Sequence, residues 1–141
     1  MIENLNFNDL NDNDKELIIK AREASDNALA DFSGTYVGAS VQTRNGNVFV
    51  GANLEYAAFD SICAERAAML NASAKGERDI QKIALYVRKM HSEHVNPPVM
   101  CAKCRVMVMY FQKKIGKTIE ILSSCPSNEK VMRYTVNDLL P

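Results

Sequence analysis

The sequence has no excess of charge of either sign. Lys and Arg together number 17, as do Asp and Glu, so the formal net charge is zero. Proteins that bind polynucleotides usually carry a basic excess, because contacts to phosphate dominate their affinity. The basic residues here are also scattered along the chain. The composition therefore argues against a nucleic-acid partner and favours a small neutral substrate.

Long hydrophobic runs and a targeting segment are also missing. The first thirty residues contain no basic stretch followed by an apolar one, which argues against a secretory signal. The longest strongly apolar run, residues 106–111, is far too short to span a membrane. We therefore expect a cytoplasmic protein without membrane contact. In a reducing compartment the four cysteines are better candidates for ligands, catalytic groups or core residues than for disulfides.

The length and composition predict one globular domain over residues 1–141. Hydrophobic residues make up 47% of the 141 residues, which is enough for a core without disulfides. No internal repeat or linker divides the chain. Residues 1–13 are rich in Asn and Asp, and we expect them to form a solvated N-terminal arm.

Hydrophobic spacing predicts alternating helices and strands. Asn45-Gly46 predicts a two-residue hairpin in which both residues have positive φ, and Gly76 is a plausible helix C-cap. Thr135 and Asp138 could cap a final helical turn. The element order predicts a three-layer α/β/α sandwich around a mixed five-stranded sheet. We expect helices over residues 14–31, 63–75 and 102–114, and strands over residues 36–43, 47–52, 80–87, 118–123 and 130–134.

Two cysteine clusters stand at the predicted starts of helices. Cys63 begins one helix, and the pair Cys101 and Cys104 begins another. A helix N-terminus favours thiolates, because its dipole stabilises negative charge. Three cysteines and a water would form a catalytic zinc site with an open position, whereas a structural site usually has four protein ligands. Cys125 lies in a turn-like segment and is interpreted as structural or incidental.

Three charged residues adjoin these clusters. Glu65 lies two positions after Cys63, so it could reach a metal-bound water without being a ligand. It would then act as the catalytic proton carrier. Taken alone, it could equally be an ordinary first-turn helix glutamate. Arg66 and Arg105 directly follow the two clusters and could donate hydrogen bonds to the cysteine sulfurs, although each could also be a plain surface arginine.

Four segments resemble the small cytidine deaminases. Residues 51–66 (GANLEYAAFDSICAER) resemble their G-x-N-x-E…C-A-E-R segment, and residues 101–105 (CAKCR) resemble P-C-G-x-C-R-Q. Residues 37–39 (VGA) and 134–141 (YTVNDLLP) are similar to a strand and to the closing segment of the family. The resemblance covers about residues 15–141.

The resemblance implies a zinc-dependent hydrolase with one Zn²⁺ per chain, held by Cys63, Cys101 and Cys104. Water activated by the metal would attack C4 of cytosine in free cytidine or deoxycytidine. Glu65 would protonate N3 and then the leaving ammonia. The main-chain N–H of Ala64 would position the pyrimidine, and Asn53 and Glu55 would hold the ribose hydroxyls. The family also implies a homotetramer and a place in pyrimidine salvage.

The sequence departs from the family pattern around the expected base and sugar pocket. Thr35 replaces a phenylalanine, Met100 and Ala102 replace the proline and glycine beside Cys101, and Val106 replaces a glutamine. The chain also ends at Pro141, without the family's aromatic tail. These changes spare the metal ligands and Glu65.

Other functions stay open at this point. The altered pocket could serve another aminated heterocycle, as in blasticidin S deaminase, a related small enzyme. A non-catalytic zinc-binding fold and a thiol redox protein using Cys101 and Cys104 are further alternatives. His91 and His94 have the spacing of a metal-binding pair, but we expect them in a solvent-facing loop.

Overall fold

A six-stranded mixed sheet forms the centre of the computed structural model, which describes residues 1–90, 96–126 and 129–139. His91 and His94 lie outside the described residues, as do Leu140 and Pro141. The elements are β1 (Glu3–Asn6), η1 (Phe7–Asp9), α1 (Asp12–Ser25), β2 (Thr35–Thr43), β3 (Val48–Ala52), β4 (Leu54–Ala57), β5 (Asp60–Ile62), α2 (Ala64–Ala74), β6 (Ile80–Lys89), α3 (Ala102–Ile115), β7 (Glu120–Ser124), β8 (Lys130–Tyr134) and η2 (Val136–Leu139).

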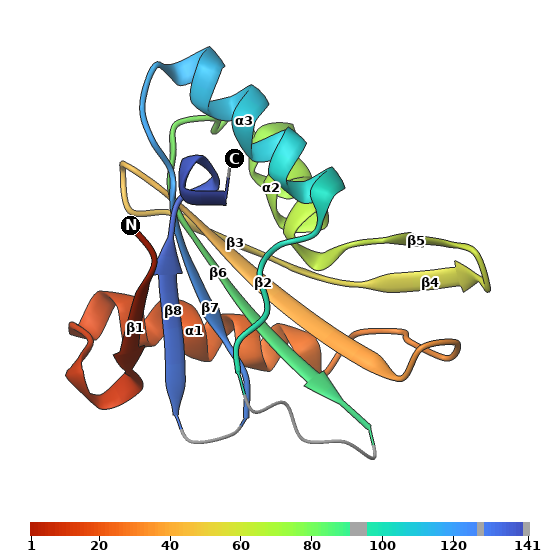
Figure 1. Cartoon of the computed structure of the whole chain (residues 1–141). Helices are drawn as coiled ribbons and strands as arrows, with labels where there is room; N and C mark the ends of the chain where they lie inside the picture. Colours follow the sequence, from red (N-terminus) through yellow and green to blue (C-terminus); the bar gives the residue numbers. More distant parts are fainter. Residues whose placement is uncertain (91–95, 127–128, 140–141) are drawn as a thin grey trace.

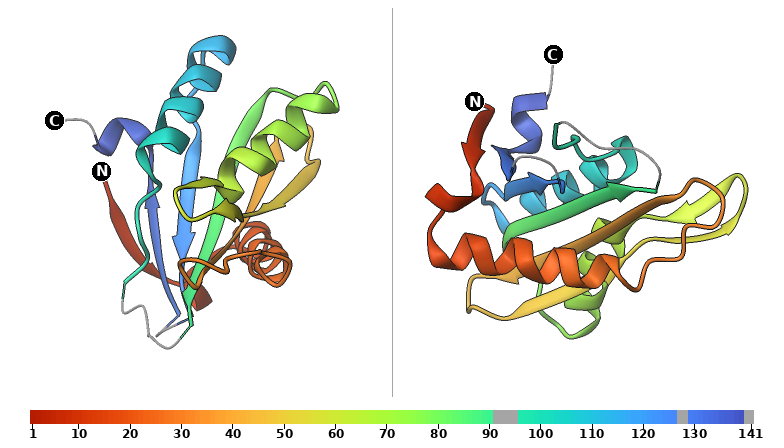
Figure 2. Two further views of the ribbon diagram at one scale, coloured as in Figure 1. Left: turned by 90° about the vertical axis from the view of Figure 1, so that its right-hand side faces the viewer. Right: turned by 90° about the horizontal axis from the view of Figure 1, so that it is seen from below.

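The strand order across the sheet is β1-β8-β7-β6-β2-β3. Strands β6 and β7 run parallel, and every other neighbouring pair is antiparallel. Helix α1 covers one face, and α2 and α3 cover the other (Figures 1 and 2). This arrangement confirms the predicted α/β/α class. The sheet has one strand more than predicted, because β1 adds to its edge beside β8.

Successive side chains of the central strands point to opposite faces of the sheet, so each face has a hydrophobic core of its own. Ile83 and Leu85 of β6 face the cluster that includes Met69 of α2 and Val108 of α3. Ala84, between them, faces the cluster built with Leu17 and other residues of α1. The same strands therefore anchor both helical layers.

Two glycines let these helices lie close to the sheet. A Cβ at Gly38 would stand 1.8 Å from the carbonyl oxygen of Ala21 in α1. A Cβ at Gly51 would stand 2.6 Å from the carbonyl oxygen of Ala64 in α2. Only glycine leaves room for these backbones, so the two positions set how near each helix approaches.

Residues 1–13, the expected solvated arm, are mostly exposed but contain regular structure. Residues Glu3–Asn6 pair antiparallel with β8, and Leu10 is buried. This pairing covers an edge of β8 that would otherwise expose unpaired backbone groups. Helix α1 then begins earlier and ends earlier than the predicted 14–31: its N-cap is Asn11, whose side chain accepts a hydrogen bond from Asp14 N at 2.8 Å.

The turn between β2 and β3 is also longer than predicted. Of the predicted pair, only Gly46 has positive φ, at 92°. Gly46 N donates to Thr43 O at 2.9 Å, and Thr43 N donates to Asn47 O at 2.9 Å. The turn is therefore of the three-residue kind with a glycine in the left-handed region, rather than a two-residue turn.

A second, two-stranded sheet lies outside the main one. Strands β4 and β5 pair antiparallel and project from the body as a ribbon, with the start of α2 at its base (Figures 1 and 2). The ribbon leads directly into Cys63, the N-cap of α2. Its position therefore brings the chain to the first predicted metal ligand.

Candidate metal centre and active site

The N-termini of α2 and α3 bring three cysteines together. Cys63 is the N-cap of α2, Cys101 is the N-cap of α3, and Cys104 lies in the first turn of α3. Their sulfurs all lie within 4.8 Å of one another. The Sγ of Cys101 is 3.5 Å from that of Cys63 and 3.3 Å from that of Cys104. Two thiolates bound tetrahedrally to one zinc ion lie about 3.8 Å apart, so the cluster fits a single ion.

The ionisation of these thiols also fits a metal site. Hydrogen bonding from Cys104, and then from Arg66 and Cys101, lowers the pKa of Cys63 to about 5, against a smaller opposing effect of burial. Hydrogen bonding to Cys63, together with burial, raises the pKa of Cys104. The cluster thus loses one proton readily and holds another firmly. A divalent cation would stabilise the other two cysteines as thiolates too. Thiolate sulfurs are ligands that zinc prefers.

Glu65 lies beside the cluster and is almost fully buried. Its exposed fraction is 4%. Burial raises the pKa of its carboxyl to about 6, because the charged form loses its hydration, and the negative charge of Cys63 acts in the same direction. A carboxyl with a pKa near 6 can both take up and release a proton at neutral pH.

The two arginines are placed differently. Arg66 Nη2 lies 3.8 Å from Cys63 Sγ and 3.4 Å from Ser61 O. Among the described residues, Arg105 makes no hydrogen bond to a cysteine sulfur, although its charge is close enough to lower the pKa of Tyr134 against the stronger effect of burial. The structure brings Arg66, but not Arg105, into contact with the cluster.

A cavity of about 170 Å³ opens beside the cysteines. Asn53, Ala64 and Glu65 lie on its wall together with Cys63 and Cys101. The other described residues of the wall carry aliphatic and small side chains and no aromatic ring: Val37, Ser61, Ile62, Leu85, Val87, Pro98 and Val99. Thr35, where the family resemblance leads us to expect a phenylalanine, is not among the described wall residues.

The two predicted ribose-binding residues are engaged elsewhere in this structure. Asn53 Oδ1 accepts a hydrogen bond from Val37 N at 2.9 Å, and its Nδ2 donates to Thr35 O at 2.9 Å. Glu55 Oε1 accepts from Phe32 N at 3.2 Å and from Ser33 N at 3.1 Å, and the bond from Ser33 N is the main cause of its lowered pKa. Asn53 still lies on the cavity wall, whereas Glu55 does not.

Two further residues near the cluster were missed by the sequence reasoning. Tyr134 OH accepts a hydrogen bond from Met100 N at 2.9 Å, and Ser123 Oγ donates to Pro98 O. Both bonds hold the segment that precedes Cys101. No sequence signal points to them, because the bonds join strands β7 and β8 to a segment 25 to 34 residues away. Cys125 is buried at the end of β7 and is not part of the cysteine cluster.

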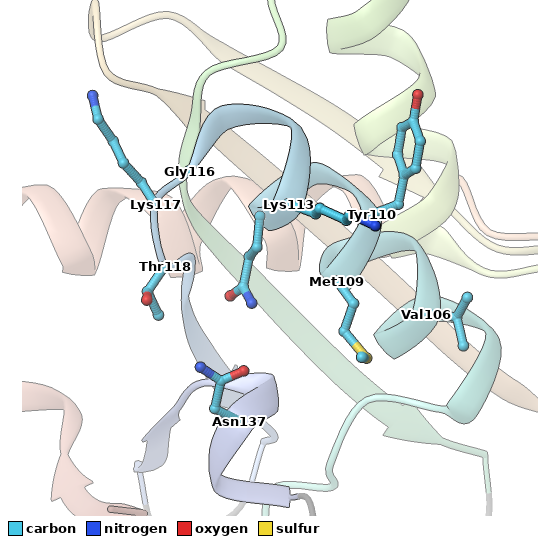
Figure 3. Close-up of a pocket in the computed structure, with 9 residues that line it drawn as sticks. Val106, Met109, Tyr110, Lys113, Gly116, Lys117, Thr118 and Asn137 are labelled. Atoms are coloured by element: carbon cyan, nitrogen blue, oxygen red, sulfur yellow. The ribbon is translucent and has the colours of Figure 1, made fainter.

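A roomier hollow lies away from the chemistry. It measures about 510 Å³ and lies between α3 and η2 (Figure 3). Its wall includes Met109 and Val106 from α3 and Asn137 from η2. None of the described residues on its wall is a cysteine or an acidic residue. None of the helices in the described residues combines the length and apolar character needed to cross a membrane.

A three-cysteine cluster at two helix N-termini, placed over the mixed sheet of an α/β/α sandwich, matches the metal ligand set of the zinc-dependent deaminases. Comparison with known proteins specifies the class further. The model of the cytidine and deoxycytidylate deaminase zinc-binding region matches residues 11–118. A cytidine deaminase from Halalkalibacterium halodurans is 30% identical over 139 residues, which cover 91% of this chain and 92% of that protein.

Solved structures agree with this comparison. The cytidine deaminase of Burkholderia pseudomallei superposes with a TM-score of 0.75 at 33% identity, covering 89% of this chain and 94% of that one. The enzyme from Mycobacterium leprae, at 21% identity, has the same fold with a TM-score of 0.71, covering 93% of this chain and 99% of that one. The chain belongs to the cytidine and deoxycytidylate deaminase family. It is an enzyme of the zinc-dependent deaminase type, and the three cysteines could hold one zinc ion.

Proposed function

We propose that the enzyme hydrolyses free cytidine and deoxycytidine to uridine and deoxyuridine with release of ammonia. The observation that carries this proposal is the convergence of three cysteine sulfurs within 4.8 Å of one another beside buried Glu65. Cys63, Cys101 and Glu65 lie on the wall of one cavity. The relatives named cytidine deaminase support the choice of substrate. The neutral net charge also fits an uncharged nucleoside rather than a polynucleotide.

The protein groups divide the chemistry between them. Cys63, Cys101 and Cys104 would hold a zinc ion, which would supply an activated water at neutral pH. The Glu65 carboxylate would take a proton from the attacking water and deliver it to N3 of the pyrimidine. It would then carry a second proton, from the hydroxyl added at C4, to the amino group that leaves as ammonia. The Ala64 main-chain N–H, in the first turn of α2, positions the base. Arg66 offsets the negative charge that three thiolates place on the site.

Asn53 is the ribose contact with the stronger support. It lies on the cavity wall, and hydrogen bonds to Val37 and Thr35 of β2 hold its side-chain amide in place. The amide keeps one further N–H donor and one further acceptor site on its oxygen, both with a fixed orientation. For Glu55 to contact the sugar, its carboxylate must share its acceptor sites with the main-chain N–H groups of Phe32 and Ser33. A carboxylate has room for such shared contacts, since its two oxygens can accept about four hydrogen bonds.

The test is deamination of cytidine and deoxycytidine by the zinc-loaded enzyme, followed by ultraviolet absorbance, with Glu65→Gln alongside. We expect turnover by the wild type and a loss of about 10²–10⁴-fold in the variant, the usual contribution of general acid–base catalysis. Glu16→Gln, which changes an exposed glutamate of α1, is the matched control and should leave the rate unchanged. Wild-type enzyme that binds one zinc per chain and turns over neither nucleoside would refute the proposed substrate.

A second candidate substrate is another aminated heterocycle, such as blasticidin S. The observation that favours it is the cavity wall, whose described residues offer aliphatic side chains and no aromatic ring against a base. A panel of aminopyrimidines and related nucleosides, assayed by ammonia release, distinguishes the two. A kcat/KM for blasticidin S above that for cytidine would select the second candidate.

We also infer a homo-oligomeric enzyme, a tetramer by its family resemblance, that serves pyrimidine salvage in the cytoplasm. Exposed apolar side chains on the β4–β5 ribbon and on α3 support self-association, among them Phe59, Tyr56 and Tyr110. The four cysteines form no disulfide, and three of them are placed as metal ligands, which fits a reducing compartment.

A further inference from the structure

The segment that delivers Cys101 to the metal centre is anchored by side chains from the sheet. Among the described residues, no turn or loop hydrogen bond between main-chain groups involves residues 96–100. Pro97 and Pro98 have no N–H to donate, so the segment cannot form a regular ladder. Its polar links instead come from β7 and β8. Ser123 Oγ donates to Pro98 O, and Tyr134 OH accepts from Met100 N at 2.9 Å.

The link between Tyr134 and Met100 is buried, and the link between Ser123 and Pro98 is partly buried. The exposed fractions of Tyr134, Met100 and Ser123 are 1%, 1% and 0%. A buried hydrogen bond resists exchange with solvent, and removing one partner leaves the other unsatisfied in the core. The Tyr134 ring also belongs to the same core cluster as Met100 and Cys104. Tyr134 therefore fixes the position of this segment both by a hydrogen bond and by packing.

The geometry has two consequences for the site. Cys101 directly follows Met100, so the hydrogen bond to Tyr134 sets where the Cys101 sulfur lies relative to Cys63 and Cys104. Pro98, bonded to Ser123, and Val99 form part of the cavity wall. Tyr134 and Ser123 therefore influence both the position of Cys101 and the shape of the cavity wall.

We propose that Tyr134 and Ser123 are positioning residues of the metal centre: they hold the 96–100 segment so that Cys101 joins the other two ligands and Pro98 lines the cavity. Neither residue lies on the described cavity wall, and no hydrogen bond among the described residues joins either hydroxyl to a cysteine sulfur; they act through the main chain of the segment. The proposal rests on the assignment of Cys63, Cys101 and Cys104 as zinc ligands.

Tyr134→Phe and Ser123→Ala test it, because each removes one hydroxyl and little else. We expect each to weaken zinc binding by about 10–100-fold, the range found when groups that orient metal ligands are removed, as measured by competition with a chelator. The cobalt-substituted variants should show a shifted thiolate-to-cobalt absorption band, since the Cys101 sulfur no longer has one fixed position. Because Pro98 lines the cavity, Ser123→Ala should also raise KM more than Tyr134→Phe does.

Each variant has a matched control on the same sheet. Ser124→Ala removes the neighbouring buried hydroxyl of β7, which donates to Leu85 O at 2.8 Å. Tyr86→Phe removes a half-buried tyrosine hydroxyl of β6, on the face covered by α1. Both controls should bind zinc and show the cobalt spectrum of the wild type.

The outcomes separate the proposal from the assignment beneath it. Wild-type zinc affinity and cobalt spectra in Tyr134→Phe and Ser123→Ala would overturn the positioning role while leaving the ligands in place. A wild-type protein that binds no zinc would overturn both. Should Tyr134→Phe fail to fold by circular dichroism, Ser123→Ala decides alone, because it removes the second anchor of the same segment. Equal losses in Ser123→Ala and Ser124→Ala would show general weakening of β7 and also overturn the role.

Discussion

The four cysteines occupy surroundings that assign them different chemistry. Three of them converge at helix N-termini, where the dipole and neighbouring donors favour thiolates. Cys125 is buried outside that cluster. We therefore expect Cys125 to take no part in metal binding, although it is buried as Cys104 is.

Alanine substitutions of the cysteines should therefore separate into two groups. We expect Cys104→Ala to lose stoichiometric zinc, because two thiolates leave the ion with too few protein ligands. Cys125→Ala is the matched buried control and should retain one zinc per chain. The measurement is metal content after gel filtration, with thiol alkylation of the loaded protein as a second readout. Zinc at wild-type stoichiometry in Cys104→Ala would contradict the ligand assignment.

Glu65 carries a cost in stability that its proposed role explains. Folding raises its pKa from an ordinary 4.5 to about 6 through burial. A carboxyl with a raised pKa binds more protons in the native state, so it lowers stability above the native pKa. The effect disappears below the unfolded pKa, where both states are protonated.

Metal-free Glu65→Gln should accordingly be more stable than metal-free wild type at pH 7. The pKa difference corresponds to about 2 kcal/mol of unfolding free energy, an upper figure since glutamine is polar too. Urea unfolding at pH 7 and pH 4 checks this. The advantage of the variant should shrink as the pH falls through about 6 towards 4.5. A constant difference at both pH values would point to packing rather than charge.

Sequence reasoning identified the residues of the metal cluster but not the contacts of the pocket. Cysteines at fixed spacing from predicted helix starts can be found from the sequence alone, and the structure brings those three together. The partners of Asn53 and Glu55 lie 16 to 23 residues away, on β2 and the segment before it. Such pairings depend on how the strands are placed, which local patterns do not encode.

At the scale of elements, strong periodicity decided what could be predicted. The long strands and α2 and α3 lie within a few residues of the predicted ranges, because each buries an apolar face. Strands β1, β4 and β5 were missed. They have three or four residues each, and their side chains are mostly exposed. Each is defined by hydrogen bonds to a partner strand, so its own sequence shows no apolar periodicity from which a strand could be predicted.

Helix α2, which carries Cys63 at its N-cap, lies very close to β3. A Cβ at Gly51 would lie 2.5 Å from Ala68 N and 2.6 Å from Ala64 O, both of them rigid backbone atoms. We expect Gly51→Ala to lower the unfolding free energy by about 1–3 kcal/mol or more, as overpacking does in other cores. It should also weaken zinc binding, because α2 carries Cys63 at its N-cap.

Urea unfolding and chelator competition measure the two effects of Gly51→Ala. Val50→Ala, at the preceding exposed position of the same strand, is the control and should change both quantities little. An alanine at position 51 that is tolerated at wild-type stability and zinc affinity would mean that α2 can move away without disturbing Cys63.

At the scale of the whole molecule, several large apolar side chains lie outside the two cores and are exposed to solvent. The ribbon β4–β5 stands away from the sheet (Figures 1 and 2), and Phe59 at its turn is 93% exposed. Tyr56 on β4, Ile62 on β5 and Val106 on α3 are exposed as well. Exposed apolar groups gathered on a projecting element mark an interaction surface, and the homo-oligomer proposed above would cover them with a second copy of the chain.

Phe59→Ser should therefore reduce self-association without unfolding the monomer. The side chain makes almost no contact within one chain, so its loss leaves both cores intact. Burying a phenylalanine contributes about 1.5–3 kcal/mol, and each subunit of an oligomer would lose that contribution. Light scattering on a concentration series should show a wild-type oligomer that dissociates at higher concentration in the variant. Ile2→Ser, beside β1 at the far edge of the sheet, is the matched control and should keep the wild-type mass. A monomeric wild type, or a variant whose mass equals the wild-type mass at every concentration, would exclude the ribbon as the contact between subunits.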